Sequence, residues 1–284
     1  MSLWRFLAFA FALACGALEA AEPPGYFPGK DWRESTPEAQ GIDSTVLAHM
    51  VENISQKNLN VHSITVLRHG YVVMDAYFYP YRRDAVHDVA SVTKSITSAL
   101  VGIAVDKGLI STDRRLLTFF PSEAPRDPEP TKKQITVDNL LTMRPGMDCG
   151  FKPGEQELEA MRRTDNWVQY ALAMPMINPP GTKFGYCSPG FHLLSSIVTA
   201  ATHEPEADFG RKNLFEPIGI EKDVIWPPDP QGRTHGWGDS HFYPRDLARI
   251  GYLYLHNGEW SGKQIISSDW VKQSTTVHAN TGRP

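Results

Sequence analysis

A serine and a lysine that can act as nucleophile and base stand three residues apart in Ser91-Val92-Thr93-Lys94. Residues with this spacing share one face of a helix. A serine hydroxyl needs a base before it attacks a carbonyl, and a lysine can be that base in its neutral form, which desolvation favours. The following residues are strongly apolar, so we expect a buried Lys94. The four residues alone fit equally well a helix that begins with a capping serine and a surface lysine.

A second candidate group is Tyr186-Cys187-Ser188, which follows a loop rich in glycine and proline. A tyrosine hydroxyl beside a lysine can take a proton from a nucleophile or give one to a leaving group. We therefore predict that Tyr186 faces the same cleft as Ser91. The alternatives are an ordinary half-buried tyrosine and a Ser188 that only caps the next helix.

Helices must position these residues, because helical periodicity dominates the middle of the chain. An apolar helix over 90–108 carries Ser91, and further helices are predicted over 44–56, 136–143, 155–174, 188–202, 207–214, 243–256 and 267–273. Two strands, 63–68 and 71–79, are predicted to form a hairpin around His69-Gly70. A two-stranded hairpin is marginal by itself, and few strand candidates follow residue 215.

The first residues predict export. One arginine, Arg5, precedes an apolar run over 6–18, and small residues follow at Ala20 and Ala21. This is the pattern of a secretory signal, here residues 1–21; a buried N-terminal helix is the alternative. Cys15 offers another reading, a lipid anchor. No other segment is apolar enough to span a membrane, so we expect a periplasmic or secreted domain over 22–284.

The composition limits which classes of partner and substrate we expect. The net charge is −4 with no basic block, which argues against nucleic acid and leaves a small-molecule or peptide-like substrate. No Cys or His spacing is typical of a metal site, so we expect neither metal nor cofactor. Cys149 and Cys187 can form a bridge in an oxidising compartment or stay as free thiols.

The two motifs together resemble the serine β-lactamase and penicillin-binding superfamily, in its class C-like branch of esterases and 6-aminohexanoate-dimer hydrolases. Five further segments strengthen the resemblance, which covers the chain from about residue 40: 140–146, 180–186, 213–220, 246–251 and 260–266. It implies an α+β fold, with an antiparallel sheet region beside a mainly helical region. It also implies that Ser91 is acylated and that Lys94 and Tyr186 move protons.

Two departures from that family qualify the resemblance. Ser188 stands where class C β-lactamases usually carry Asn, which favours an esterase or amidase. The family's third motif, a Lys/His-x-Gly strand edge with an oxyanion-hole donor, has no match before Pro284. We therefore expect a domain that lacks its last strands and helix and leaves a hairpin edge exposed.

Weaker candidates for substrate binding are Ser188, His235 and Tyr243, the last two beside the glycines of 236–238. A packing role is the alternative for each. The chemistry fits an ester, lactam, D-amino-acid amide or oligoamide substrate. Two other functions stay open: a non-catalytic relative that binds penicillin or peptide, and an inactive truncated remnant.

Overall fold

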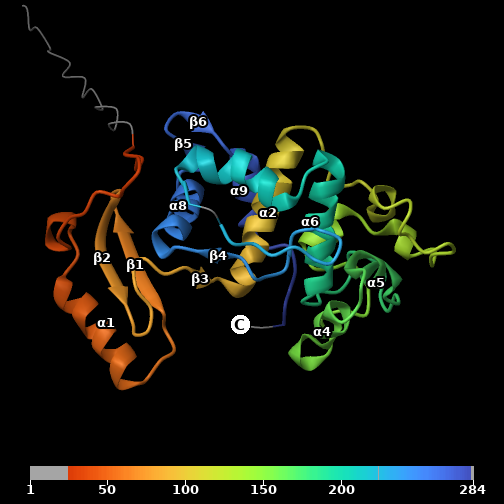
Figure 1. Ribbon diagram of the computed structural model, residues 1–284, viewed down its shortest axis with the longest axis horizontal. Coiled ribbons are helices and arrows are strands. Elements are labelled where there is room, and N and C mark those ends of the chain that lie inside the picture. The colour runs from red at the N-terminus through yellow and green to blue at the C-terminus, as the bar shows by residue number, and fades with distance from the viewer. Residues whose placement is uncertain (1–24, 223, 283–284) are drawn as a thin grey trace, which may run out of the picture.

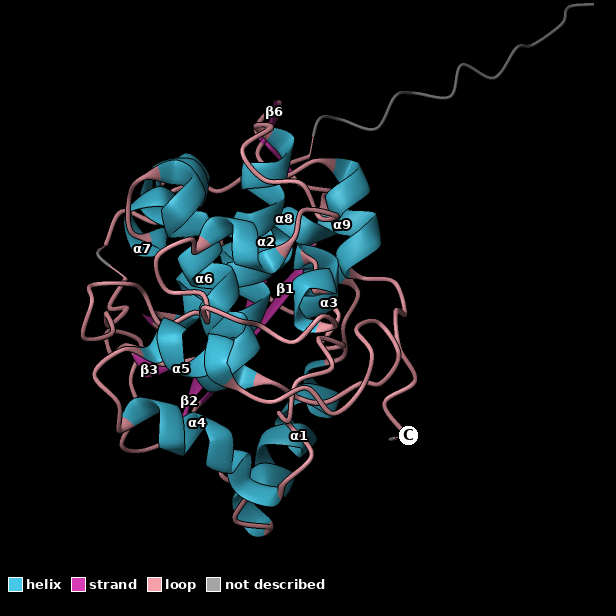
Figure 2. Ribbon diagram, turned by 90° about the vertical axis from the view of Figure 1, so that its right-hand side faces the viewer, coloured by secondary structure: helices cyan, strands magenta, loops and turns pink. Residues whose placement is uncertain are grey.

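The computed structural model describes residues 25–222 and 224–282, so the predicted signal segment and Cys15 lie outside the described residues. Its main elements, in chain order, are α1 (Ser44–Gln56), β1 (Ser63–Arg68), β2 (Tyr71–Tyr77), β3 (His87–Asp88), α2 (Thr93–Asp106), α3 (Val137–Leu141), α4 (Gln156–Arg162), α5 (Trp167–Ala173), α6 (Ser188–Thr202), α7 (Glu206–Gly210), β4 (His241–Phe242), α8 (Pro244–Leu255), β5 (Glu259–Trp260), β6 (Lys263–Gln264) and α9 (Ser268–Ser274). In the described residues the strands form three antiparallel pairs, and the rest of the chain consists of helices joined by long loops (Figure 2). This arrangement confirms the α+β class.

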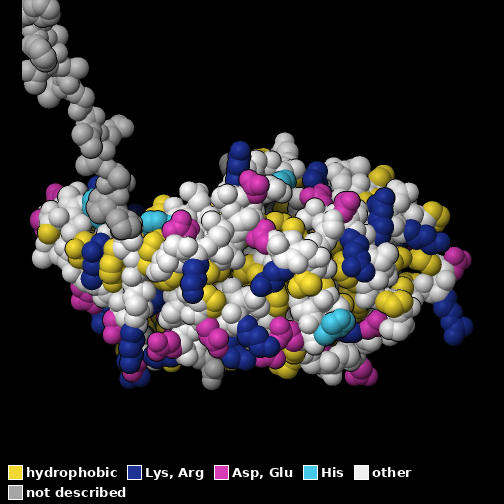
Figure 3. All heavy atoms as spheres, turned by 90° about the horizontal axis from the view of Figure 1, so that it is seen from above, with side chains coloured by type: hydrophobic (Ala, Val, Ile, Leu, Met, Phe, Trp, Pro, Cys, Tyr) yellow, Lys and Arg dark blue, Asp and Glu magenta, His cyan; other side chains and the backbone are white. Residues whose placement is uncertain are grey.

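The hairpin and α1 lie together at one end of the molecule (Figure 1). Helices α2 and α6 pack against each other at the centre, and α4 and α5 lie beyond them. Charged side chains of both signs are interspersed over the face seen in Figure 3. Among the described residues, no helix is long and apolar enough to cross a membrane.

The β1–β2 hairpin has the turn that its sequence predicts. His69 and Gly70 have φ of 50° and 75°, as a two-residue turn with both central residues left-handed requires. Strand β2 ends at Tyr77, two residues before the predicted limit. On the edge of β2 that faces away from β1, Val72 exchanges hydrogen bonds with Arg33 and Ser35. Among the described residues, no strand pairs with the opposite, outer edge of β1.

Helix α1 has the predicted bounds. The carboxylate of Asp43 accepts from the backbone N–H of Thr45 at 2.8 Å, so Asp43 is the N-cap. Ile54 is buried, whereas Val46 is 63% exposed, so the helix packs through a narrow apolar stripe.

Helix α2 forms the centre of the core. Ala99, Leu100 and Val101 are fully buried. A Cβ added to Gly102 would lie 2.4 Å from the Trp270 ring of α9, so this glycine allows the two helices to approach closely. Gly108, with φ of 70°, follows the helix and supplies the left-handed residue that commonly terminates one.

The helix predicted over 155–174 is two helices. The side chain of Asn166 accepts from the backbone N–H of Gln169 at 2.9 Å and starts α5 anew, since asparagine competes with the helical backbone for its donors. At the other end of α5, Lys132 is buried and donates to the carbonyls of Leu172 and Met174 at 2.8 and 2.6 Å. A cation at this position satisfies the last carbonyls of the helix.

The segment before α1 is tied to α8 by one buried side chain. The Arg249 guanidinium, 2% exposed, donates to the carbonyls of Pro28, Gly29 and Lys30 and to that of Ile218 at 2.7 to 3.3 Å. Four neutral oxygens thus solvate a cation that is cut off from water, as a buried charge requires.

Candidate active site

Ser91 is exposed and lies in a single 3-10 turn, Ala90–Val92, that leads into α2. The α-helix itself begins at Thr93, so Ser91 precedes the helix that was expected to contain it. Ala90 has a left-handed φ of 45° and donates its N–H to the carboxylate of Asp88 at 2.7 Å. A non-glycine residue in this conformation costs on the order of 1–3 kcal/mol, and such strain concentrates at functional sites. The turn holds the Ser91 side chain clear of the core.

Lys94 belongs to the first turn of α2 and is 5% exposed. Its Nζ donates to Ser91 Oγ at 3.2 Å and to the carbonyl of Trp237 at 2.7 Å. The same Nζ lies 4.7 Å from the centroid of the Tyr186 ring. The lysine is therefore fixed by three partners from three separate parts of the chain.

Tyr186 contacts Lys94 through the face of its ring. The loop around it is held by a disulfide between Cys149 and Cys187, with Cα atoms 5.1 Å apart. Gly150 has a φ of 82°, and a Cβ there would lie 2.3 Å from the Tyr186 nitrogen. The chain around Cys149 thus lies directly against the backbone of Tyr186.

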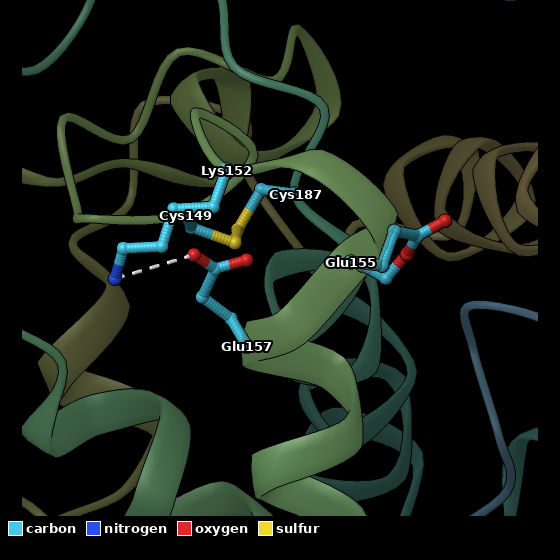
Figure 4. The surroundings of a disulfide bond; sticks show 6 residues. Cys149, Lys152, Glu155, Glu157 and Cys187 are labelled. Carbon is cyan, nitrogen blue, oxygen red and sulfur yellow. Dashed lines mark hydrogen bonds and ion pairs between the residues drawn. A yellow bond between two sulfur atoms is a disulfide. The ribbon is translucent and has the colours of Figure 1, made fainter.

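Figure 4 shows the surroundings of this disulfide. Lys152 reaches Glu157 at 3.6 Å on one side of the bond, while Glu155 points to the other side. There the Glu155 carboxylate accepts a hydrogen bond from Ser188 Oγ. Both cysteines are buried, so the bridge joins the two segments from within.

A cleft of about 620 Å³ opens beside Ser91. Ser91, Lys94 and Tyr186 line one part of it. The remaining lining is mostly apolar and comes from α2, α3, α6, α8 and α9: Val92, Ser95, Ile96, Ser98, Leu141, Met143, Phe191, Leu247, Ile250, Gly251, Tyr254, Ser274 and Thr275. Such a pocket suits a substrate with an apolar portion beside a reactive carbonyl.

The three weaker candidates do not line this cleft. Ser188 is 1% exposed and bonded to Glu155. His235 is buried, bonded to Asp239 at 2.9 Å and stacked on the Trp237 ring. Tyr243 lines a smaller cavity, where its ring lies 3.9 Å from Lys222 Nζ.

Sequence reasoning missed the main-chain support of Lys94. The backbone of residues 234–240, here called the 234–240 segment, is anchored to α2 and α6 by side chains. Ser195 Oγ donates to the Thr234 carbonyl at 2.7 Å and Thr97 Oγ1 to the Gly236 carbonyl at 3.0 Å. A carbonyl has no sequence signature, so the one useful signal was the cluster of glycines at 236–238. Within the part of the chain that the structure describes, no cluster of His, Cys, Asp or Glu could hold a metal ion.

Comparisons with known proteins place this geometry in context. The chain is 23% identical to 6-aminohexanoate-dimer hydrolase of Paenarthrobacter ureafaciens, over 95% of this chain and 68% of that protein. It is 30% identical to Penicillin-binding protein 4 of Amycolatopsis lactamdurans, over 51% of this chain and 38% of that protein. Lovastatin esterase of Penicillium rubens is 28% identical over 72% of this chain and 57% of its own.

Solved structures share the fold. A putative 6-aminohexanoate-dimer hydrolase from Bacillus anthracis superposes with a TM-score of 0.69 at 21% identity, covering 79% of this chain and 61% of that one. A family VIII carboxylesterase superposes with a TM-score of 0.64 at 16% identity, covering 88% and 78%. The match spans less than two thirds of several relatives, including Penicillin-binding protein 4 and Lovastatin esterase.

The Beta-lactamase family matches residues 47–284, which include Ser91, Lys94, Tyr186 and every element that lines the cleft. The fold is accordingly β-lactamase/transpeptidase-like. This chain belongs to the Beta-lactamase family.

Proposed function

We propose that the protein is an exported serine hydrolase that cleaves an ester or amide bond through an acyl-enzyme on Ser91. The observation that carries the proposal is the approach of the buried Lys94 Nζ to Ser91 Oγ, at 3.2 Å, on the wall of an open cleft. Relatives named as a dimer hydrolase and an esterase support hydrolysis as the general reaction.

The proposed reaction has two halves. Ser91 Oγ attacks the substrate carbonyl carbon, its proton passes to a neutral Lys94, and the carbonyl oxygen takes up negative charge. The backbone N–H of Ser91 has no acceptor among the described residues and can donate to that oxygen. The leaving group departs with a proton delivered by Lys94 or Tyr186, and water then attacks the ester on Ser91 by the reverse route.

The test is to label the protein with a fluorophosphonate and to locate the adduct by peptide mass spectrometry. We expect a single adduct on Ser91 together with hydrolysis of p-nitrophenyl esters. Ser91→Ala should lose both, whereas Ser55→Ala, an exposed serine on α1, should keep both. Hydrolysis that survives in Ser91→Ala would place the nucleophile elsewhere.

The relative named Penicillin-binding protein 4 supports a second candidate function, binding without turnover. Under that function a penicillin would acylate Ser91 once, and the acyl group would stay attached to the serine. A burst of one equivalent of product with no steady state distinguishes this outcome from hydrolysis. Absence of any adduct would identify an inactive protein.

A further inference from the structure

Glu206, at the start of α7, is fully buried, with 0% of its surface exposed, and is used by none of the chemistry above. Burial raises the pKa of Glu206 to about 7, because removal from water penalises the carboxylate. A fully buried carboxyl group destabilises the fold unless it is hydrogen-bonded. The groups around Glu206 indicate which hydrogen bonds it can make.

The groups that face the Glu206 carboxyl are the hydroxyls of Ser195 and Thr97. Each hydroxyl has one proton, and each gives it to the 234–240 segment: Ser195 to the Thr234 carbonyl and Thr97 to the Gly236 carbonyl. Among the described residues, neither carboxyl oxygen of Glu206 therefore receives a well-aligned hydrogen bond. The protonated acid can donate to a hydroxyl oxygen and leave both anchors intact, whereas a carboxylate can only accept and must draw those protons away.

The 234–240 segment is the support of Lys94. The carbonyl of Trp237, next to Gly236, accepts from Lys94 Nζ at 2.7 Å. Gly236 lies close to α6, since a Cβ there would lie 2.3 Å from the Phe191 carbonyl oxygen. Loss of the Thr97 and Ser195 anchors would free the segment beside Gly236 and so displace the Trp237 carbonyl that Lys94 binds.

No charged group contributes to the pKa of Glu206, because its shift comes from burial and the two hydroxyls alone. Charged or titratable groups of the neighbouring elements have partners elsewhere: Lys94 with Trp237, His192 with Asp229, His235 with Asp239, Lys212 with Glu204, and Arg211 with Glu216. Asp208 of α7 is exposed to solvent. The protonation state of Glu206 thus depends on its burial and on its two hydroxyl neighbours.

We propose that protonated Glu206 is a positioning residue, which keeps Thr97 and Ser195 bonded to the 234–240 segment and thereby holds Lys94 against Ser91. The effect on the reaction rests on the proposed hydrolase function. The effect on the segment does not.

The sign of the pH dependence follows. Below the pKa of about 7 Glu206 carries its proton and the segment is anchored. As the pH rises through that value the proton is lost and the anchors compete with the carboxylate. Glu206→Gln keeps a donor and an acceptor of the same shape without ionising, so it should hold the anchored arrangement at every pH.

The first experiment measures kcat/KM for a p-nitrophenyl ester between pH 5.5 and 9 in the full chain. We expect the ratio of Glu206→Gln to wild type to stay near one below pH 6 and to reach about tenfold at pH 8, where roughly a tenth of the wild type keeps the proton. The matched control is Glu157→Gln, another buried glutamate, 6% exposed on α4, for which the ratio should not change with pH. A ratio for Glu206→Gln that is constant with pH would overturn the proposal.

The second experiment needs no catalysis. Hydrogen exchange of the 234–240 segment, corrected for the intrinsic rate, should speed up above pH 7 in the wild type and not in Glu206→Gln. Equal protection at pH 6 and pH 8.5 in the wild type would refute the anchoring. If exchange behaves as expected but Ser91 is never labelled, the proposed function fails and the anchoring stands.

A third variant covers a Glu206→Gln protein that does not fold. Thr97→Val removes one anchor directly and should expose the 234–240 segment to exchange at all pH values, whereas Thr97→Ser should restore protection. Protection that is unchanged in Thr97→Val would show that the segment does not depend on these anchors.

Discussion

At the scale of the residue, the site depends on the contacts of Lys94. Its amine has a hydroxyl, a carbonyl and an aromatic face within reach, and it is almost completely buried. Those neighbours fix the direction of the amine, and burial removes the water that would otherwise compete for it.

Lys94→Ala should therefore lower kcat/KM for an ester by on the order of 10²–10⁴-fold, the usual contribution of a positioned base, with a smaller change in KM. Steady-state kinetics with a p-nitrophenyl ester would measure both. Lys107→Ala, at the exposed end of the same helix, is the control and should behave as the wild type. A Lys94→Ala protein with kcat/KM within threefold of the wild type would contradict the role assigned to this amine.

Residue types and spacing predicted three side chains that the structure brings together, Ser91, Lys94 and Tyr186, but not how all of them are held. Ser91 and Lys94 were found because a hydroxyl and an amine one turn apart have a recognisable meaning. The Trp237 carbonyl and Glu206 were not found, since their importance arises from a fold that joins residues far apart in the chain. His235 was selected for its chemistry, yet the structure buries it in a stack with Trp237.

At the scale of the element, helices with a clear apolar period were predicted well. The bounds of α1 and α6 agree with the sequence-based ones. Errors occurred where a single polar side chain decides the backbone, as Asn166 does between α4 and α5. The β3–β4 pair joins His87 to Phe242. A local sequence pattern does not predict a contact between residues so far apart in the chain.

The disulfide gives a prediction at this scale. Cys149 and Cys187 are 38 residues apart, so the chain-entropy estimate for the closed loop is about 4 kcal/mol of stability. The double variant Cys149→Ser, Cys187→Ser should lose about that much in urea denaturation. Because Tyr186 adjoins the bridge, kcat should also fall by roughly one to two orders of magnitude, the cost of a misplaced group.

Two measurements separate these effects. Denaturation midpoints report the loss of stability, and the rate of Ser91 labelling under fully native conditions reports the position of Tyr186. Treatment of the wild type with dithiothreitol should reproduce both changes. An unchanged labelling rate in a destabilised protein would restrict the bridge to a structural role.

At the scale of the whole molecule, the segment before α1 is an integral part of the domain. Arg249 binds three of its carbonyls, and Trp32 Nε1 donates to the Arg245 carbonyl at 3.1 Å. If residues 1–21 are removed as a signal, these contacts remain. A cut after Lys30 would remove the three carbonyls that Arg249 binds and leave only the Trp32 contact.

Arg249→Leu should cost about 3–5 kcal/mol in the free energy of unfolding, as expected for the loss of a buried charged group whose partners stay buried. Four carbonyls would lose their donor at once. Urea denaturation followed by tryptophan fluorescence would measure the change. Arg211→Leu, an exposed partner of Glu216, should shift stability by less than about 1 kcal/mol, and an equal shift for both arginines would contradict this account.

The outer edge of β1 has a consequence of a different kind. Main-chain amides and carbonyls along that edge are a template on which a further extended segment can be laid. Two copies that met there would continue one sheet across their contact. Dilution would then lower the fraction of paired copies, so activity and stability would depend on the protein concentration.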